Sequence, residues 1–248
     1  MTVYFIGAGP GDPELITVKG QRLIRACPVI IYAGSLVPEA LLTGNTARHI
    51  HNSAELHLTQ IIELIAAAHA RGEDVARVHS GDPGLYGAIG EQIRVLRDLG
   101  IDYEIVPGVT ATAACAALLG VELTLPDVSQ TVILTRYGDK SPMPAGEELA
   151  SLARHGATMA IHLGVKNLAS IVAELVPCYG ADCPVAIVHK ASWPEQDWVL
   201  GTLATIESLA AAKDFRRSAL ILVGRVLQAD SFAESALYRA GHAHLYRP

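Results

Sequence analysis

One stretch of the sequence decides the fold: Val75-Ala76-Arg77-Val78-His79, followed by Ser80-Gly81-Asp82-Pro83-Gly84. The first part is typical of a short β-strand, and the second part predicts a sharp turn. Apolar residues then recur at helical spacing from Leu85 to Leu96. Asp82 is therefore predicted on a strand-to-helix turn, where open α/β sheets bind ligands. Alternatively, Asp82 only caps the helix, with Pro83 at its first position.

The same alternation of strand and helix runs through the first half of the chain. Further strands are predicted at Val3–Ile6, Val29–Tyr32 and Tyr103–Val106. An alanine-rich helix is predicted from about Thr110 to Leu119, and Asp12 is predicted to cap the helix after the first strand. This alternation favours a parallel sheet with helices on both faces.

The second half has a different pattern. Its predicted helices lie near 147–153, 168–175 and 206–211, and its strand candidates are Thr131–Thr135, Met159–Leu163, Val185–His189, Trp198–Leu200 and Ala219–Val223. The third and fourth candidates are too close in sequence for a crossover helix, so we expect an antiparallel pair in a mixed sheet. The expected fold class is thus two-domain α/β, with domains at 1–120 and 121–248.

Composition narrows the range of functions. Half of the 248 residues are hydrophobic, yet no apolar run is long enough to span a bilayer. The net charge is −6 with no basic block, which disfavours nucleic acid as a partner. The N-terminal stretch lacks the features of a signal peptide, so we expect a cytoplasmic protein. The four cysteines (Cys27, Cys115, Cys178 and Cys183) form no metal-binding pair, and we expect reduced thiols and no metal.

A glycine loop, Gly7-Ala8-Gly9-Pro10-Gly11, follows the first predicted strand. It is an imperfect match to a dinucleotide-binding loop, because the third glycine comes one position early. The second strand also ends in Ala33-Gly34 without the acidic residue that would hold a ribose. The loop could still bind an anion at a helix N-terminus, with Gly9 and Gly11 as candidate contacts, or it could serve only as a tight connection.

Three motifs together resemble the tetrapyrrole methylases, S-adenosylmethionine enzymes that act on corrinoid and sirohaem precursors. They are the opening Tyr4–Gly20, the turn Ser80–Pro83, and Val106–Ala111. Within this family, the stretches Leu125–Arg136 and His189–Pro194 are similar to the precorrin-4 C-11 methyltransferases. The resemblance covers nearly the whole chain.

The resemblance implies a parallel-sheet N-terminal domain, a mixed-sheet C-terminal domain, a homodimer, and a methyl donor bound in the cleft between domains. S-adenosyl-L-methionine is the implied donor. Its implied contacts are Pro10, Ser80, Gly81, Asp82, Leu85, Thr110, Ala111, Leu163 and Ala191. No residue of the sequence can be identified as a catalytic base, so the catalytic residues stay unknown.

The implied reaction is methylation of precorrin-4 at C-11 to give precorrin-5, in cobalamin biosynthesis. The alternatives are cobalt-precorrin-4 or another tetrapyrrole as acceptor, a nucleotide oxidoreductase, and a non-catalytic nucleotide-binding module. Precorrin-4 carries many carboxylates, which arginine and lysine would bind. Arg136 and Lys190 are the main candidates, beside Lys19, Arg77 and Lys140.

Two histidines and one tryptophan near the motif turns complete the set of candidates. His79 and His189 end predicted strands and are low-ranking proton carriers, since strand-end histidines more often pack or cap. Trp193 either stacks on the macrocycle or packs at a hairpin.

Overall fold

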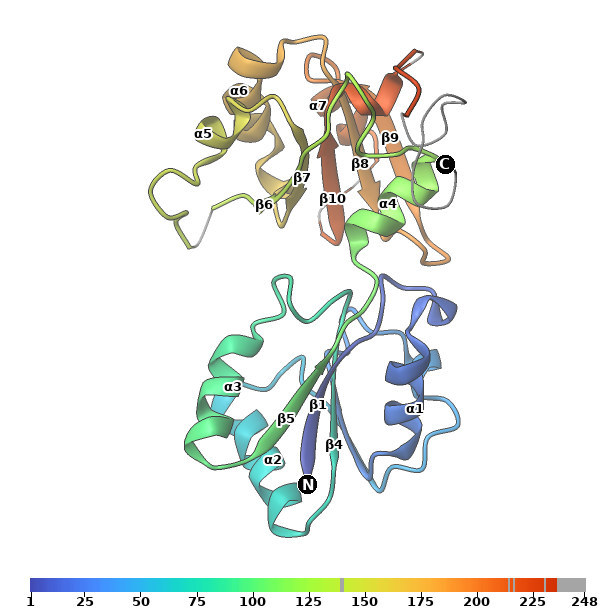
Figure 1. Cartoon of the computed structure of the whole chain (residues 1–248), viewed down its shortest axis with the longest axis vertical. Helices are drawn as coiled ribbons and strands as arrows, with labels where there is room; N and C mark the ends of the chain where they lie inside the picture. Colours follow the sequence, from blue (N-terminus) through green and yellow to red (C-terminus); the bar gives the residue numbers. More distant parts are fainter. Residues whose placement is uncertain (139–140, 214, 216, 230, 236–248) are drawn as a thin grey trace, which may run out of the picture. The chain divides into compact units, whose positions relative to one another are not determined.

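The computed structural model describes residues 1–138, 141–213, 215, 217–229 and 231–235. The chain divides into two units (Figure 1). Unit 1 contains Met1–Ala114 together with Ser192–Pro194, and unit 2 contains the other described residues. The division falls within helix α4 (Ala111–Leu119).

Unit 1 is built on a five-stranded sheet in the order β3-β2-β4-β1-β5, with every pair parallel. The strands are β1 (Thr2–Gly7), β2 (Val29–Tyr32), β3 (His49–Asn52), β4 (Val75–His79) and β5 (Asp102–Val106). The helices are α1 (Val18–Ala26), α2 (Leu58–Ala70) and α3 (Ile89–Asp98), with short 3-10 turns η1 (Pro13–Leu15) and η2 (Glu39–Leu42). The parallel sheet predicted from the alternation is confirmed.

Neighbouring residues of β1 point to opposite faces of this sheet. Phe5 packs on one side with Ile61 and Ile93 from α2 and α3. Ile6 packs on the other side with Ile24 from α1. Each fully buried side chain of this size contributes about 1.5–3 kcal/mol. Helices therefore cover both faces, and the strand ends at the sheet edge are left to form turns.

Unit 2 contains a five-stranded sheet in the order β6-β7-β10-β8-β9. Its strands are β6 (Val132–Arg136), β7 (Thr158–His162), β8 (Pro184–His189), β9 (Asp197–Thr202) and β10 (Ala219–Val223). Only β6 and β7 pair in parallel, so the sheet is mixed and β8–β9 is antiparallel, as predicted. The remaining elements are α5 (Leu149–Ala153), η3 (Val165–Asn167), α6 (Leu168–Tyr179), α7 (Ile206–Ala211) and η4 (Arg225–Gln228).

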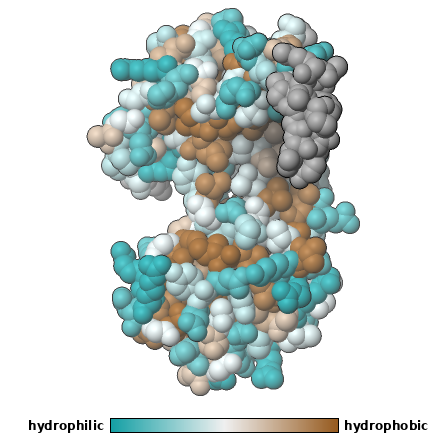
Figure 2. Space-filling model, in the orientation of Figure 1, coloured by the Kyte–Doolittle hydropathy of each residue, from teal (hydrophilic) through white to brown (hydrophobic). Residues whose placement is uncertain are grey.

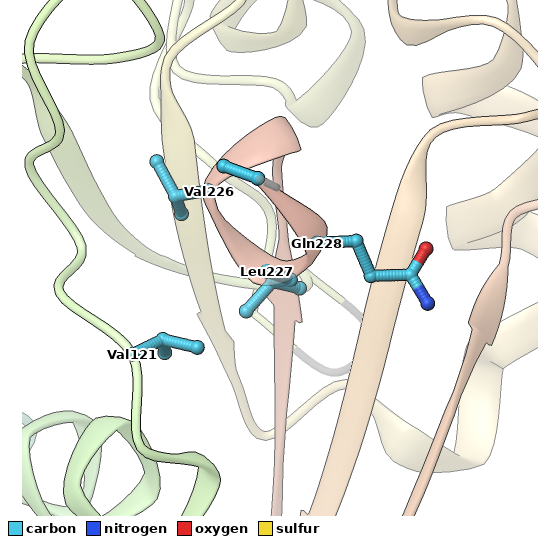
Figure 3. A pocket seen from close by; sticks show the side chains of 5 residues that line it. Val121, Val226, Leu227 and Gln228 are labelled. Carbon is cyan, nitrogen blue, oxygen red and sulfur yellow. The ribbon is translucent and has the colours of Figure 1, made fainter. Parts of the chain in front are cut away.

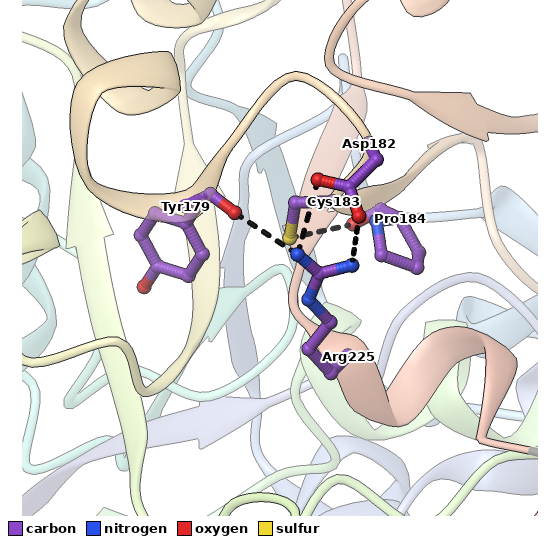
Figure 4. Close-up of polar contacts among 5 residues, drawn as sticks. All are labelled: Tyr179, Asp182, Cys183, Pro184 and Arg225. Carbon is purple, nitrogen blue, oxygen red and sulfur yellow. Dashed lines mark hydrogen bonds and ion pairs between the residues drawn. The ribbon is translucent and has the colours of Figure 1, made fainter.

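An ion pair connects the end of α6 to η4 in unit 2 (Figure 4). The Arg225 guanidinium donates to both carboxylate oxygens of Asp182, at 2.8 and 3.1 Å, and to the Tyr179 carbonyl. This bidentate contact holds the pKa of Asp182 below its usual value. Both partners are exposed, so we assign it a local positioning role only.

Unit 1 differs from the sequence-based prediction at three places. The edge strand β3 was missed, because His49–Asn52 is mostly polar and exposed. Helix α3 begins at Ile89 rather than after Pro83, because Tyr86 and Ala88 have left-handed backbones that interrupt a helix. Asp12 caps only the three-residue η1, and the Thr17 side chain caps α1.

The distribution of hydrophobic residues bears on membrane association and on the exposed surface. Among the described residues, no helix has the length and apolar character needed to cross a membrane. Figure 2 shows hydrophobic residues on the visible face of unit 1, in the part that contains the carboxyl ends of its strands.

Candidate functional site

Three turns meet at the carboxyl edge of the unit 1 sheet, because β1 lies between β4 and β5 and all three are parallel. The turn after β1 pairs with the turn after β4 through a two-way backbone bridge. Gly9 donates its N–H to the Gly81 carbonyl at 3.2 Å, and Gly81 donates to the Gly9 carbonyl at 2.7 Å. The strand order thus brings the first two motifs into direct contact.

The glycines of these turns are needed because the backbones approach closely. A Cβ on Gly7 would lie 2.6 Å from the Gly108 backbone, and a Cβ on Gly108 would lie 2.1 Å from the Gly81 carbonyl oxygen. Gly81 itself has a φ of 60°, yet a Cβ there would meet only the Val109 carbonyl, at 3.9 Å. Apart from that carbonyl oxygen, the space beside the Gly81 backbone is open, which suits a ligand that must come close to the chain.

Asp82 connects two of the turns. Its Oδ1 accepts from the Gly84 N–H at 2.7 Å, and its Oδ2 accepts from the Gly108 N–H at 2.8 Å. The alternative that Asp82 caps the following helix is wrong, because α3 starts later and Asp82 instead holds the turn after β5. Each carboxylate oxygen keeps a second acceptor position, so a ligand hydroxyl or amine could still donate to it.

The other predicted donor contacts of unit 1 lie on the same turns. Thr110 accepts from the Ala113 N–H and so caps α4, while Ala111 begins that helix. Leu85 donates its N–H to the Asp82 carbonyl. All seven of these residues are half-buried: Pro10, Ser80, Gly81, Asp82, Leu85, Thr110 and Ala111. The structure therefore gathers every predicted donor contact of unit 1 at one edge of one sheet.

Two further donor candidates lie at strand ends in unit 2. Leu163 follows β7 with a φ of 57° and is 70% exposed, which is unusual for a large apolar residue. Ala191 follows β8 and is buried between the left-handed residues Lys190 and Ser192. Because β7 and β8 both run antiparallel to β10, their carboxyl ends share one edge of the sheet.

The glycine loop is already occupied by protein contacts. Ala8 and Gly9 donate their N–H groups to the carbonyls of His79 and Gly81, and Asp12 donates to the Ser192 hydroxyl. The Asp12 carboxylate stands at the start of η1 and accepts from the Glu14 N–H. This arrangement leaves little donor capacity for a substrate acid, so Gly9 and Gly11 as acceptor contacts stay a prediction.

The predicted acceptor cations are also engaged. Arg136 donates to the carbonyls of Ser141 and Pro142, at 2.9 and 3.4 Å. Lys190 lies 3.8 Å from the Glu195 carboxylate. Lys19 pairs with Glu104, and Lys140 lies outside the described residues. Arg136 and Lys190 as acceptor contacts stay a prediction.

Arg77 and His79 are buried inside unit 1. Arg77 donates to the Gln92 side chain and the Ile31 carbonyl, and burial lowers its pKa to about 10. His79 is 5% exposed, and its Nε2 has no hydrogen-bond partner among the described residues. Burial, followed by the charge on Arg77, lowers the pKa of His79 to about 3. His79 is therefore neutral near pH 7 and a poor proton donor.

His189 and Trp193 serve packing roles in the structure. His189 bonds the Arg217 carbonyl through Nδ1 and stacks on Phe215. Trp193 donates its indole N–H to the Pro10 carbonyl at 2.8 Å. This contact between distant parts of the sequence was missed, although the pairing of a bulky tryptophan with the bare Gly11 could have suggested it. Across the described residues, no cluster of three or more potential metal ligands occurs.

A surface pocket elsewhere in unit 2 carries none of these candidates. It is lined by Val121, Val226, Leu227, Gln228 and Ala229 (Figure 3). Its lining offers one amide side chain and otherwise aliphatic groups, so it supplies no charge or nucleophile. The site is therefore better defined by the strand-end turns than by this hollow.

Comparisons with known proteins agree with this geometry. The family model of the Tetrapyrrole (Corrin/Porphyrin) Methylases matches residues 2–207. A Pseudomonas aeruginosa protein named precorrin-4 C(11)-methyltransferase is 73% identical over 248 residues, covering 100% of this chain and 99% of the relative.

Two solved structures are similar in fold. The structure of a cobalt precorrin-4 methyltransferase, a cobalamin biosynthetic enzyme, matches with a TM-score of 0.88 and 40% identity, covering 91% of this chain and 95% of the other. A uroporphyrin-III C-methyl transferase from Thermus thermophilus, complexed with S-adenyl homocysteine, matches with a TM-score of 0.76 and 29% identity over 95% and 97% of the two chains. With its strand-end turns and a family match over most of its length, the chain belongs to the tetrapyrrole methylases.

Proposed function

We propose that this chain transfers a methyl group from S-adenosyl-L-methionine to C-11 of precorrin-4, giving precorrin-5 in cobalamin biosynthesis. The observation that carries the proposal is the open space beside the Gly81 backbone, next to Asp82, whose carboxylate accepts from the Gly84 and Gly108 N–H groups. Open space of this kind suits a donor that must lie against the main chain. The full-length similarity to precorrin-4 methyltransferases supports the choice of acceptor.

The bound donor supplies an electrophilic methyl group on a positively charged sulfur. The chain's residues have to hold and orient the donor and the acceptor rather than protonate them, since in-line methyl transfer depends mainly on the alignment of the two reactants. Asp82 offers acceptor oxygens to hydroxyl or amino groups of the donor. Leu163 offers an exposed apolar side chain, which suits the face of an adenine ring. The remaining proposed contacts are Pro10, Ser80, Gly81, Leu85, Thr110, Ala111 and Ala191.

The acceptor is a ring with several carboxylates. Arg136 uses two of its N–H groups on backbone carbonyls, which leaves further donors for an acid side chain. Lys190 stands beside Ala191, close in sequence to a proposed donor contact. We therefore keep Arg136 and Lys190 as proposed acceptor residues, with Gly9 and Gly11 as weaker ones. Cobalt-precorrin-4 is the second candidate acceptor, favoured by the similarity to a cobalt precorrin-4 methyltransferase.

Two finer features belong to the same proposal. We expect a homodimer, on the basis of the family resemblance, and a cytoplasmic location, on the basis of the biosynthetic role. Size-exclusion chromatography with light scattering tests the first of these directly.

The deciding experiment incubates the protein with donor carrying a ¹³C-methyl group and with either precorrin-4 or cobalt-precorrin-4. NMR of the product is expected to place the label at C-11. Label at another carbon would reassign the acceptor position. Donor binding without transfer to any tetrapyrrole would instead favour the non-catalytic binding module. The matched control is Gly90→Ala, a change in α3 that meets no atom within 4 Å.

A further inference from the structure

A short segment of the chain leaves unit 2 and packs within unit 1. Ser192–Pro194 belongs to unit 1, whereas the residues on both sides of it, up to Ala191 and from Glu195, belong to unit 2. We propose that Ser192 and Trp193 clamp the glycine loop after β1 and thereby position Pro10 for the methyl donor. This inference deepens the proposed function and rests on it.

Three contacts define the clamp. The Trp193 indole N–H donates to the Pro10 carbonyl at 2.8 Å, and the Ser192 hydroxyl accepts from the Asp12 N–H at 3.0 Å. The indole ring also lies against Gly11, where a Cβ would be 2.2 Å from the ring. Successive residues of the loop, from Pro10 to Asp12, are thus held by successive residues of the segment.

The backbone is strained at the first residue of the segment and two residues before it, which is a sign that the position of the segment is enforced. Lys190 and Ser192 have φ values of 46° and 68°, a conformation that residues other than glycine rarely adopt. Such strain persists only where surrounding contacts overdetermine it, and it gathers at ligand sites. The Lys190 N–H donates to the Ser218 carbonyl at 2.9 Å, so the chain is also fixed two residues before the segment begins.

The clamp lies next to two proposed donor contacts. Pro10 is the residue whose carbonyl Trp193 binds, and Ala191 precedes Ser192 directly in the chain. Trp193 is therefore a positioning residue, because it acts on the donor through Pro10 rather than by contact with the reacting atoms.

The test uses two mild variants of the full chain. Trp193→Phe keeps a large ring on Gly11 but removes the indole donor, and Ser192→Ala removes the hydroxyl acceptor. Trp198→Phe is the matched control, because Trp198 is the other tryptophan and lies 43% exposed on β9. Calorimetry with S-adenosyl-L-methionine, without an acceptor, gives donor affinity, and urea unfolding gives stability.

The expected result is a roughly tenfold loss of donor affinity in Trp193→Phe and a smaller loss in Ser192→Ala. The donor KM should rise by a similar factor, while the acceptor KM and the unfolding midpoint stay near the wild-type values. Trp198→Phe should match the wild type in all of these.

Unchanged donor affinity in folded Trp193→Phe and Ser192→Ala would overturn the clamp. So would an affinity that falls only in proportion to the folded fraction, because that would mark a merely structural contact. A wild-type protein that binds the donor but does not methylate precorrin-4 would refute the proposed function alone. A wild type that binds no donor would refute both.

Discussion

The two units differ in the residues that stand directly at their strand ends. In unit 1 the turns after β1, β4 and β5 have glycine at the points where they meet, and their backbones approach one another closely at Gly7, Gly81 and Gly108. In unit 2 the turns after β7 and β8 carry side chains on left-handed backbones, at Leu163 and Lys190. Glycine accepts the left-handed region at little cost, whereas other residues pay about 1–3 kcal/mol for it.

The difference separates two tasks of a binding site. Bare backbone lets a ligand approach closely and offers N–H and carbonyl groups at fixed positions. A strained residue that keeps its side chain, such as the exposed Leu163, offers an apolar surface instead. Glycine at the position of Leu163 would relieve the backbone strain. The presence of a larger residue there indicates that its side chain has a function.

The largest effect is expected at the contact of the glycine turns. Gly108→Ala would place a Cβ 2.1 Å from the Gly81 carbonyl oxygen, where only backbone surrounds it. We expect a loss of about 3 kcal/mol in the free energy of unfolding, because backbone cannot move aside as a flexible side chain can. Urea unfolding measures this. Gly90→Ala in α3 should be neutral or slightly stabilising, and equal stabilities of the two variants would contradict the account.

The next effect concerns the connection between the turns. Asp82→Ala removes the acceptors of the Gly84 and Gly108 N–H groups. We expect donor affinity to fall at least tenfold, corresponding to about 1.4 kcal/mol, while the protein stays folded. Asp82→Asn keeps one acceptor oxygen and should lie between Ala and the wild type. Calorimetric affinities equal to the wild type would remove Asp82 from the donor site.

Acid should weaken the folded chain through His79. The unfolded chain binds a proton below about pH 6.5, whereas the folded chain, with the His79 pKa near 3, does not until much lower pH. Stability is thus retained above pH 6.5 and lost progressively toward pH 3, by roughly 1 kcal/mol between pH 7 and pH 5.5. His79→Asn should flatten this dependence in urea unfolding. An unchanged slope would show that His79 is not its source.

The smallest effect distinguishes the two kinds of turn most sharply. Leu163→Gly should stabilise the protein by about 0.5–1 kcal/mol, because glycine relieves the left-handed strain and little buried surface is lost. The same change should weaken donor binding if the side chain serves the adenine. Leu163→Ala keeps the strain and should not be stabilising. A glycine variant that is stabilised and binds the donor normally would leave the strain at Leu163 without a function.

Much of the fold follows from the sequence by itself. The hydrophobic pattern and the turn residues of the sequence predicted β2, β4 and β10 at their observed bounds. Each of these strands is a short run rich in aliphatic residues that ends at a strong turn signal. The antiparallel β8–β9 pair followed from the short spacing between its strands. The motifs at Ser80–Pro83 and Val106–Ala111 pointed to the family, because they encode the close turns directly.

The tertiary structure alone decided what those turns do. The sequence could not show that Asp82 holds the Gly108 turn or that Trp193 binds the Pro10 carbonyl, because these partners are far apart along the chain. It also could not place Arg77 and His79 in the core, since charged and polar residues usually predict exposure. Local propensities depend on neighbours in sequence, whereas these contacts depend on strand order, which brings the ends of β1, β4 and β5 to one edge of one sheet.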